Sequence, residues 1–154
     1  NDKLKMATTV TPADAVVTLG VTLTLAGKTF DVSYAKTLSS CTRADRNIVP
    51  VPTSEIGLVQ LTAAGDIGIG KFSDFDGFFV ANRDDTNFVR IRIVKTGADT
   101  VDFKLEAGQF MILWNKKMDV NTTEAAFAAF VDLDTVYVQA DTAAVDVEYL
   151  AVQI

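Results

Sequence analysis

Histidine is absent from the 154 residues, and cysteine occurs only once, at Cys41. Without histidine the chain has no Ser-His-Asp or Cys-His nucleophile system, and most kinds of zinc site are excluded as well. A single cysteine excludes an intrachain disulfide, which fits a reducing compartment. The glycines between Gly65 and Lys71 lack the spacing of a phosphate-binding loop. These absences predict a protein that is not an enzyme and that needs no cofactor.

Basic clusters and long apolar runs are also scarce. The longest apolar run covers residues 125–131, far short of the roughly 20 residues of a membrane span, and no apolar segment of a secretory signal follows Lys3 and Lys5. The net charge is −6, and no basic residue follows Lys117. Because nucleic-acid binding requires clustered Lys and Arg, the sequence predicts neither a nucleic acid nor a membrane as a partner.

Short alternating segments dominate the rest of the sequence. Apolar residues make up 49% of the chain and charged residues only 22%, with abundant Val and Thr, and this mixture suits half-buried strands. Residues 15–25 alternate in polarity, Ala26-Gly27 suits a tight turn, and residues 28–34 return, which predicts a β-hairpin. Further strands are expected at 56–61, 67–72, 78–81, 88–94, 101–105, 109–114, 135–140 and 145–152.

This pattern predicts an all-β chain with one antiparallel, jelly-roll-like β-sandwich domain over residues 15–154. Residues 1–14 show no periodicity and are expected to form an extended N-terminal arm. Residues 36–54, which include Pro50 and Pro52, are expected to form a long loop or second arm. One short helix is predicted over residues 122–130, where Thr122 or Thr123 can cap the first turn and four alanines follow.

The acidic stretch NRDDTN is a weak candidate for a metal site. Its oxygen donors for calcium are Asn82, Asp84, Asp85 and Asn87, but they do not have the spacing of an EF-hand. Asn and Asp tolerate left-handed φ and bind their own backbone, so we interpret the stretch as a turn. The strand after it should bury one row of side chains and turn the other outward: Val89, Ile91 and Ile93 inward, Arg90 and Arg92 outward.

The stretch SDFDGFF contains Asp74 and Asp76, a carboxylate pair of the kind that glycosidases use. Such pairs are common in acidic proteins, so a loop that ends at Gly77 is the favoured interpretation and a hydrolase the least favoured function. The aromatic residues on predicted strands are interpreted as core, in preference to an exposed sugar-binding platform: Phe78, Phe79, Phe103, Phe110 and Trp114.

Three stretches between Phe78 and Ile154 resemble small β-sandwich structural proteins of tailed bacteriophages: FFVANRDDTNFVRIRI, FKLEAGQFMIL and VYVQADTAAVDVEYLAVQI. In that family a strand ending in Asn leads through a short acidic turn into a second strand. An L-x-x-G turn precedes the next apolar strand, and a final hairpin closes the sheet. Residues 82–87, 105–108 and 137–149 correspond to these features. The N-terminal half matches only loosely, and the alanine-rich segment and the Pro-Val-Pro stretch depart from the pattern.

The resemblance implies a virion protein that decorates or cements the major capsid lattice, placed on the capsid surface and assembled in the host cytoplasm. Its partners would be the major capsid protein or another virion protein, and copies of itself, with a trimer favoured. The two arms would contact these partners through Lys3, Lys5, Lys36, Arg43, Arg46, Val49, Pro50, Val51 and Pro52. A tail, collar or head-fibre adaptor and a carbohydrate-binding β-sandwich module stay open as alternatives.

Overall fold

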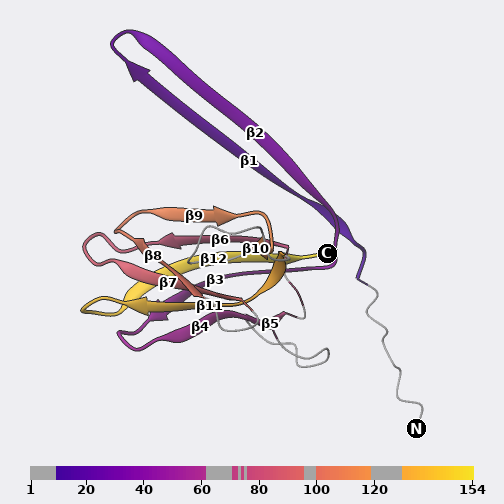
Figure 1. The fold of residues 1–154 in the computed structure, drawn as a ribbon, viewed down its shortest axis with the longest axis vertical. Helices are drawn as coiled ribbons and strands as arrows, with labels where there is room; N and C mark the ends of the chain where they lie inside the picture. The colour runs from indigo at the N-terminus through magenta and orange to yellow at the C-terminus, as the bar shows by residue number, and fades with distance from the viewer. Residues whose placement is uncertain (1–9, 62–70, 73, 75, 96–99, 119–129) are drawn as a thin grey trace. The chain divides into compact units, whose positions relative to one another are not determined.

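The computed structural model describes residues 10–61, 71–72, 74, 76–95, 100–118 and 130–154 (Figure 1). Within these residues the chain is all-β, with twelve strands and no helix. The described residues divide into two compact units, residues 10–42 with Ile154 and the described part of residues 43–153. The single domain expected over residues 15–154 is therefore replaced by two units. The predicted helix at 122–130 lies, apart from Phe130, outside the described residues.

The first unit is a long β-hairpin of β1 (Ala13–Leu25) and β2 (Lys28–Cys41) (Figure 1). Ala26 and Gly27 join the strands with φ values of 50° and 78°. Two positive φ values are typical of a type I′ turn, whose twist matches that of the strands. The hairpin predicted from residues 15–34 is confirmed, and its strands extend into both predicted arms.

The second unit contains two sheets, in which every strand pair is antiparallel except β4–β5. One sheet has the order β3-β12-β6-β9, with strands β3 (Arg43–Val51), β12 (Val145–Gln153), β6 (Gly77–Asn82) and β9 (Phe110–Leu113). The other has the order β5-β4-β11-β7-β8, with strands β5 (Lys71–Phe72), β4 (Ile56–Leu61), β11 (Val131–Ala140), β7 (Val89–Lys95) and β8 (Thr100–Leu105). The short β10 (Lys117–Met118) pairs with β11.

One hydrophobic core joins the two sheets of the second unit. Phe78, Val80 and Val147 come from the first sheet, Ile91 and Val136 come from the second, and all five are fully buried. Side chains from the inner faces of two sheets form the core of a β-sandwich in this way. The all-β prediction is confirmed, and the antiparallel sheets are consistent with the predicted sandwich.

Strand β7 shows the predicted alternation. Val89, Ile91 and Ile93 are buried in the core. The two arginines between them face outward, where Arg90 binds Glu55 at 2.7 Å and Arg92 binds Asp102 at 3.0 Å: both pairs are ion pairs on the outer face. The register of β7 is therefore set by burial, since a shift by one residue would place both arginines in the core.

The prediction of a loop over residues 36–54 is wrong, because most of these residues belong to β2 and β3. Strand β3 pairs with β12 along its whole length, from Arg43 opposite Gln153 to Val51 opposite Val145. It stands at the end of its sheet among the described strands. Edge strands tolerate a proline such as Pro50, which has no N–H to donate to a ladder.

Candidate functional site

Asn82, at the end of β6, is almost completely buried, with an exposed fraction of 1%. Its side-chain amide donates hydrogen bonds to the backbone oxygens of Asn87 at 2.8 Å and Leu105 at 3.1 Å. Its side-chain oxygen accepts a hydrogen bond from the backbone N–H of Asp84 at 3.0 Å. One amide group thus connects β6, the acidic turn and the end of β8, which is a structural role.

The other polar side chains of this turn also bind within the chain. One carboxylate oxygen of Asp84 accepts hydrogen bonds from the backbone N–H groups of Thr86 at 2.7 Å and Asn87 at 2.9 Å. These bonds, the one from Asn87 first, hold the pKa of Asp84 below its ordinary value because they stabilise the charged form. Asp85 accepts from the Thr86 hydroxyl at 2.9 Å. The interpretation of the stretch as a turn is confirmed.

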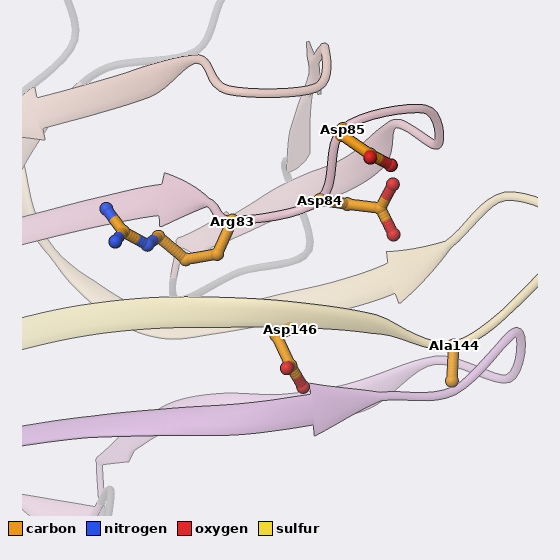
Figure 2. A pocket seen from close by; sticks show the side chains of 5 residues that line it. All are labelled: Arg83, Asp84, Asp85, Ala144 and Asp146. Atoms are coloured by element: carbon orange, nitrogen blue, oxygen red, sulfur yellow. The ribbon is translucent and has the colours of Figure 1, made fainter.

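An open pocket of about 380 Å³ lies beside this turn, lined by Arg83, Asp84, Asp85, Ala144 and Asp146. Figure 2 shows that the Asp146 carboxylate points away from those of Asp84 and Asp85. In the part of the chain that the structure describes, no three carboxylate or thiol side chains come together to hold a metal ion. Asp84 and Asp85 thus have no third carboxylate beside them among the described residues, and calcium binding by Asn82, Asp84, Asp85 and Asn87 stays a weak prediction.

Calcium is expected to leave the melting midpoint of the protein unchanged. A cation bound only by the folded state would raise this midpoint by mass action. Replacing Asp84 with alanine removes the acceptor of two backbone N–H groups and is expected to lower the midpoint by a few degrees. The matched control Asp85→Ala removes only a hydroxyl contact and should have little effect. Thermal melts with and without calcium test both points, and a calcium-dependent rise that Asp84→Ala abolishes would contradict the turn interpretation.

The effect of Asp84→Ala on the melting midpoint is expected to depend on pH. Because the pKa of Asp84 is depressed in the folded state, its stabilisation is present above the ordinary value of 3.8 and is lost as the pH falls through the lower folded value. The midpoints of the wild type and of Asp84→Ala should therefore differ at neutral pH and converge in acid. A difference that stays constant down to the most acidic pH at which the protein folds would contradict this cause.

Asp74 and Asp76 are both bound by one lysine. The Lys116 ammonium donates a hydrogen bond to Asp74 and lies 3.0 Å from a carboxylate oxygen of Asp76. The hydrogen bond to Asp74 is the main cause that raises the pKa of Lys116, burial opposes it, and the bond to Asp76 adds to it. We interpret this cluster as a group of ion pairs that holds Asp74 and Asp76 beside Lys116, and not as a catalytic pair of carboxylates.

The structure describes seven of the nine residues predicted to bind partners through the two arms. Lys3 and Lys5 lie outside the described residues, and Lys36 belongs to the hairpin. The remaining six lie in or next to β3. Their positions alternate: Arg43, Val49 and Val51 face inward, Arg46 and Pro50 face outward, and Pro52 follows the strand half-buried.

The inward-facing members are occupied by contacts within the second unit. Val51 is fully buried in the core, and Val49 packs against it. The guanidinium of Arg43 lies 4.6 Å from the centroid of the Phe72 ring. The prediction that Val51 contacts a partner is therefore wrong, because its side chain cannot be reached from outside this sandwich. Arg46 and Pro50 are the predicted contacts on β3 that do point outward.

Besides the core, a group of apolar side chains lies on the outer face of the β3-β12-β6-β9 sheet. Phe79 stands opposite Leu150 on one side and Ile112 on the other. Phe110 is 59% exposed, with its ring centroid 6.1 Å from that of Phe79, and Ile48 on β3 is 52% exposed. We call these five residues, Ile48, Phe79, Phe110, Ile112 and Leu150, the outer apolar patch.

The interpretation of the aromatic residues as core holds for Phe78 but not for Phe79, Phe103 and Phe110. Phe103 is 41% exposed, and Phe79 faces away from the core. For Phe79 and Phe110, the sequence feature that indicates an outward position is the unbroken apolar run in which each lies, FFVA and FMIL. Adjacent residues of a strand point to opposite faces, so an unbroken run necessarily places apolar side chains on both.

A charged side chain separates Ile48 from the other members of the outer apolar patch, because the row across the sheet is Ile48, Glu148, Ala81 and Phe110. Glu148 lies on the same face opposite Ile48 and is only 8% exposed. Arg46 donates a hydrogen bond to Glu148 from Nε at 2.9 Å, and Nε of Arg83 lies 3.7 Å from the other carboxylate oxygen. Both arginine side chains are mostly exposed, and Asp146 lies farther along the same face of β12. Apolar side chains and arginines thus lie together on this face, and aromatic residues and Arg are enriched at protein interfaces.

Comparison with known proteins finds no family model that matches the chain, and no curated protein or solved structure that is similar to it. Over the described residues, the structure contains no helix with the length and apolar character needed to cross a membrane. The functional argument is therefore made from the geometry of the chain itself.

Proposed function

We propose that the chain is a non-enzymatic virion structural protein, a capsid decoration or cement protein whose jelly-roll-like sandwich binds and stabilises the lattice of the major capsid protein. The observation that carries this proposal is the outer apolar patch. The sandwich already has a complete core on the other side of the same sheet. The patch is thus apolar surface beyond what the core uses, and exposed apolar surface of this kind is characteristic of binding sites.

The polar groups of the second unit support the same conclusion. The acidic turn is held by its own hydrogen bonds, and Asp74 and Asp76 are held by Lys116. These groups stabilise the sandwich. The outer apolar patch, with arginines beside it, suits contact with another protein more than chemistry on a small molecule.

A repeating lattice also suits a contact of modest size. Each apolar Å² removed from water contributes roughly 25 cal/mol, so a patch of five side chains, of which Phe79, Ile112 and Leu150 are already half-buried, supports only a weak single contact. Copies that are linked to one another bind a repeating surface at several points together. Once one copy is bound, the next is held at a high effective concentration near its own site, so the assembly binds more tightly than a single copy does. Self-association of this chain would therefore strengthen its attachment to a capsid.

The proposal is tested by co-sedimentation of the purified chain with empty shells of the major capsid protein encoded by the same viral genome. Ile48→Asp introduces a charge in the outer apolar patch and is expected to weaken binding at least about tenfold, because the carboxylate would lose its water at the interface. Val94→Asp is the matched control, since Val94 is a half-buried aliphatic residue on the outer face of the other sheet. Absence of wild-type binding at both low and high salt would contradict the proposal, as would equal loss in the two variants.

A tail, collar or head-fibre adaptor would use the same surface, and imaging of the virion separates these locations. Carbohydrate binding is a second candidate because the exposed Phe110 lies beside Phe79, with their ring planes tilted by 34°. A glycan array that detects a sugar bound by the wild type and not by Phe110→Ala would favour it over the capsid proposal.

A further inference from the structure

The β1–β2 hairpin has one apolar face and one polar face. Directly opposite residues of an antiparallel pair lie on the same face, and the register pairs Leu19 with Tyr34, Val21 with Val32, and Leu23 with Phe30. The pairs between them form the other face: Thr18 with Ala35, Gly20 with Ser33, Thr22 with Asp31, and Thr24 with Thr29. We call the first set, together with Leu25, the ribbon face.

The ribbon face is exposed along its whole length. Across the described residues, the exposed fractions of its seven members run from 43% for Leu19 to 71% for Tyr34. The seven fractions together equal about four whole side chains. Because five of the seven are smaller than an aromatic side chain, the lower end of the 150–250 Å² aromatic range applies, and the exposed surface is on the order of 600 to 700 Å². That equals or exceeds the largest apolar patch of a typical monomer. An isolated two-stranded hairpin is only marginally stable in water unless its apolar face is packed against something.

We propose that the ribbon face is covered by the ribbon face of a second copy of this chain, with the two hairpins stacked face to face. Two such ribbons have the same width and the same length, so neither leaves apolar side chains uncovered. Stacking at the usual spacing of about 10 Å places both apolar faces inside and both threonine-rich faces outside. The pair is then a small two-layer sandwich in which the apolar side chains of each strand are buried and the polar ones face water.

The surface area that such a dimer would bury is large enough for a stable interface. If each ribbon face contributes on the order of 600 to 700 Å², the total buried surface falls at the lower end of the 1,200–2,000 Å² of specific interfaces. A two-fold pair brings one surface against itself, so a surface that is apolar over its whole length is automatically complementary to its copy. A different protein would have to present a flat apolar strip of matching length.

The charges on the hairpin also permit this arrangement. The charged side chains of the apolar side are Lys28, opposite Leu25, and Lys36, opposite Val17, and they stand at the two ends of the apolar rows. Their ammonium groups can reach water at the ends while the stems cover apolar surface. Asp31 belongs to the polar face. The centre of the ribbon face, at Val21 and Val32, holds no charge that stacking would bury.

The test is sedimentation equilibrium of the full chain with two lysine variants of adjacent residues. Val21→Lys places a charge at the centre of the ribbon face and is expected to weaken self-association about a hundredfold or more. Thr22→Lys adds the same side chain to the polar face, opposite Asp31, and should associate as the wild type does. Thermal melts check that the sandwich of the second unit is intact in both variants. Association that survives Val21→Lys overturns the proposal, as does a wild type that stays monomeric at every soluble concentration.

A second measurement keeps the test independent of any folding defect that a lysine causes in the hairpin. In a Cys41→Ser background, Val21→Cys is expected to form a covalent dimer on mild oxidation, while Thr22→Cys is not. Equal cross-linking of the two variants overturns the face-to-face arrangement. A native mass of three chains overturns the two-fold pair in favour of the trimer that the phage resemblance implies. Failure of capsid binding leaves this proposal unaffected, because Ile48 and Val21 belong to different units.

Discussion

Replacing Phe78 with alanine is expected to lower the free energy of unfolding by about 3–5 kcal/mol. The Phe78 side chain is fully buried in the core between the two sheets of the second unit. Its strand, β6, has β12 on one side and β9 on the other. Because the backbone is held on both sides, the surroundings cannot collapse into the cavity that the missing ring leaves. Chemical denaturation followed by circular dichroism measures the change.

The adjacent residue provides the matched control. Phe79 has the same side chain on the same strand, but it points to the outer face and is half-buried. Phe79→Ala is expected to cost less than about 2 kcal/mol, since it removes a ring that is already partly in water. It should instead weaken binding to capsid shells. Equal destabilisation by the two substitutions would show that the faces of β6 have been assigned incorrectly.

Replacing Asn82 with aspartate is expected to lower the free energy of unfolding by about 3–5 kcal/mol. The change exchanges an NH₂ group for a carboxylate oxygen 2.8 Å from the backbone oxygen of Asn87 and 3.1 Å from that of Leu105. Both carbonyls lose their donor, and a charge is buried without a partner. The loss should shrink in acid, because a protonated carboxyl group regains one donor. Urea denaturation at neutral and acidic pH measures both effects.

Asn115→Asp is the control for this substitution. Asn115 is exposed, and its side-chain oxygen accepts a hydrogen bond from the backbone N–H of Lys117 at 3.0 Å. A carboxylate can accept the same bond, so the free energy of unfolding should stay within about 0.5 kcal/mol of the wild type. If Asn82→Asp were as mild as this control, Asn82 would not connect β6, the turn and β8 as described.

The segments that could be predicted from the sequence are those whose structure depends on neighbouring residues along the chain. Alternation predicted the hairpin and the buried row of β7, and Ala26-Gly27 adopts the two positive φ values that a tight hairpin turn requires. The acidic stretch after Asn82 folds as the turn that its Asn and Asp residues favour. Turn chemistry and strand alternation act over two to five residues, so a single sequence contains the information.

The segments predicted incorrectly depend on contacts between distant parts of the chain. Pro50 and Pro52 favoured a loop, but β3 pairs with β12, about 100 residues later, and its edge position accommodates the proline. Phe110 was interpreted as core because it is aromatic and lies in a strand, yet it is 59% exposed. Neither the neighbour of a strand nor the sheet face that is buried can be read from local pattern alone.

The hairpin shows most clearly the difference between what local sequence determines and what tertiary packing determines. The sequence by itself determined that Leu19, Val21 and Leu23 share one face, because side chains of a strand alternate with a period of two. Only the tertiary structure decided that the hairpin unit leaves this face uncovered while the equally apolar row of β7 is buried inside the second unit. The physical reason is that alternation establishes which side chains point the same way, whereas burial depends on whether another layer of structure lies against them.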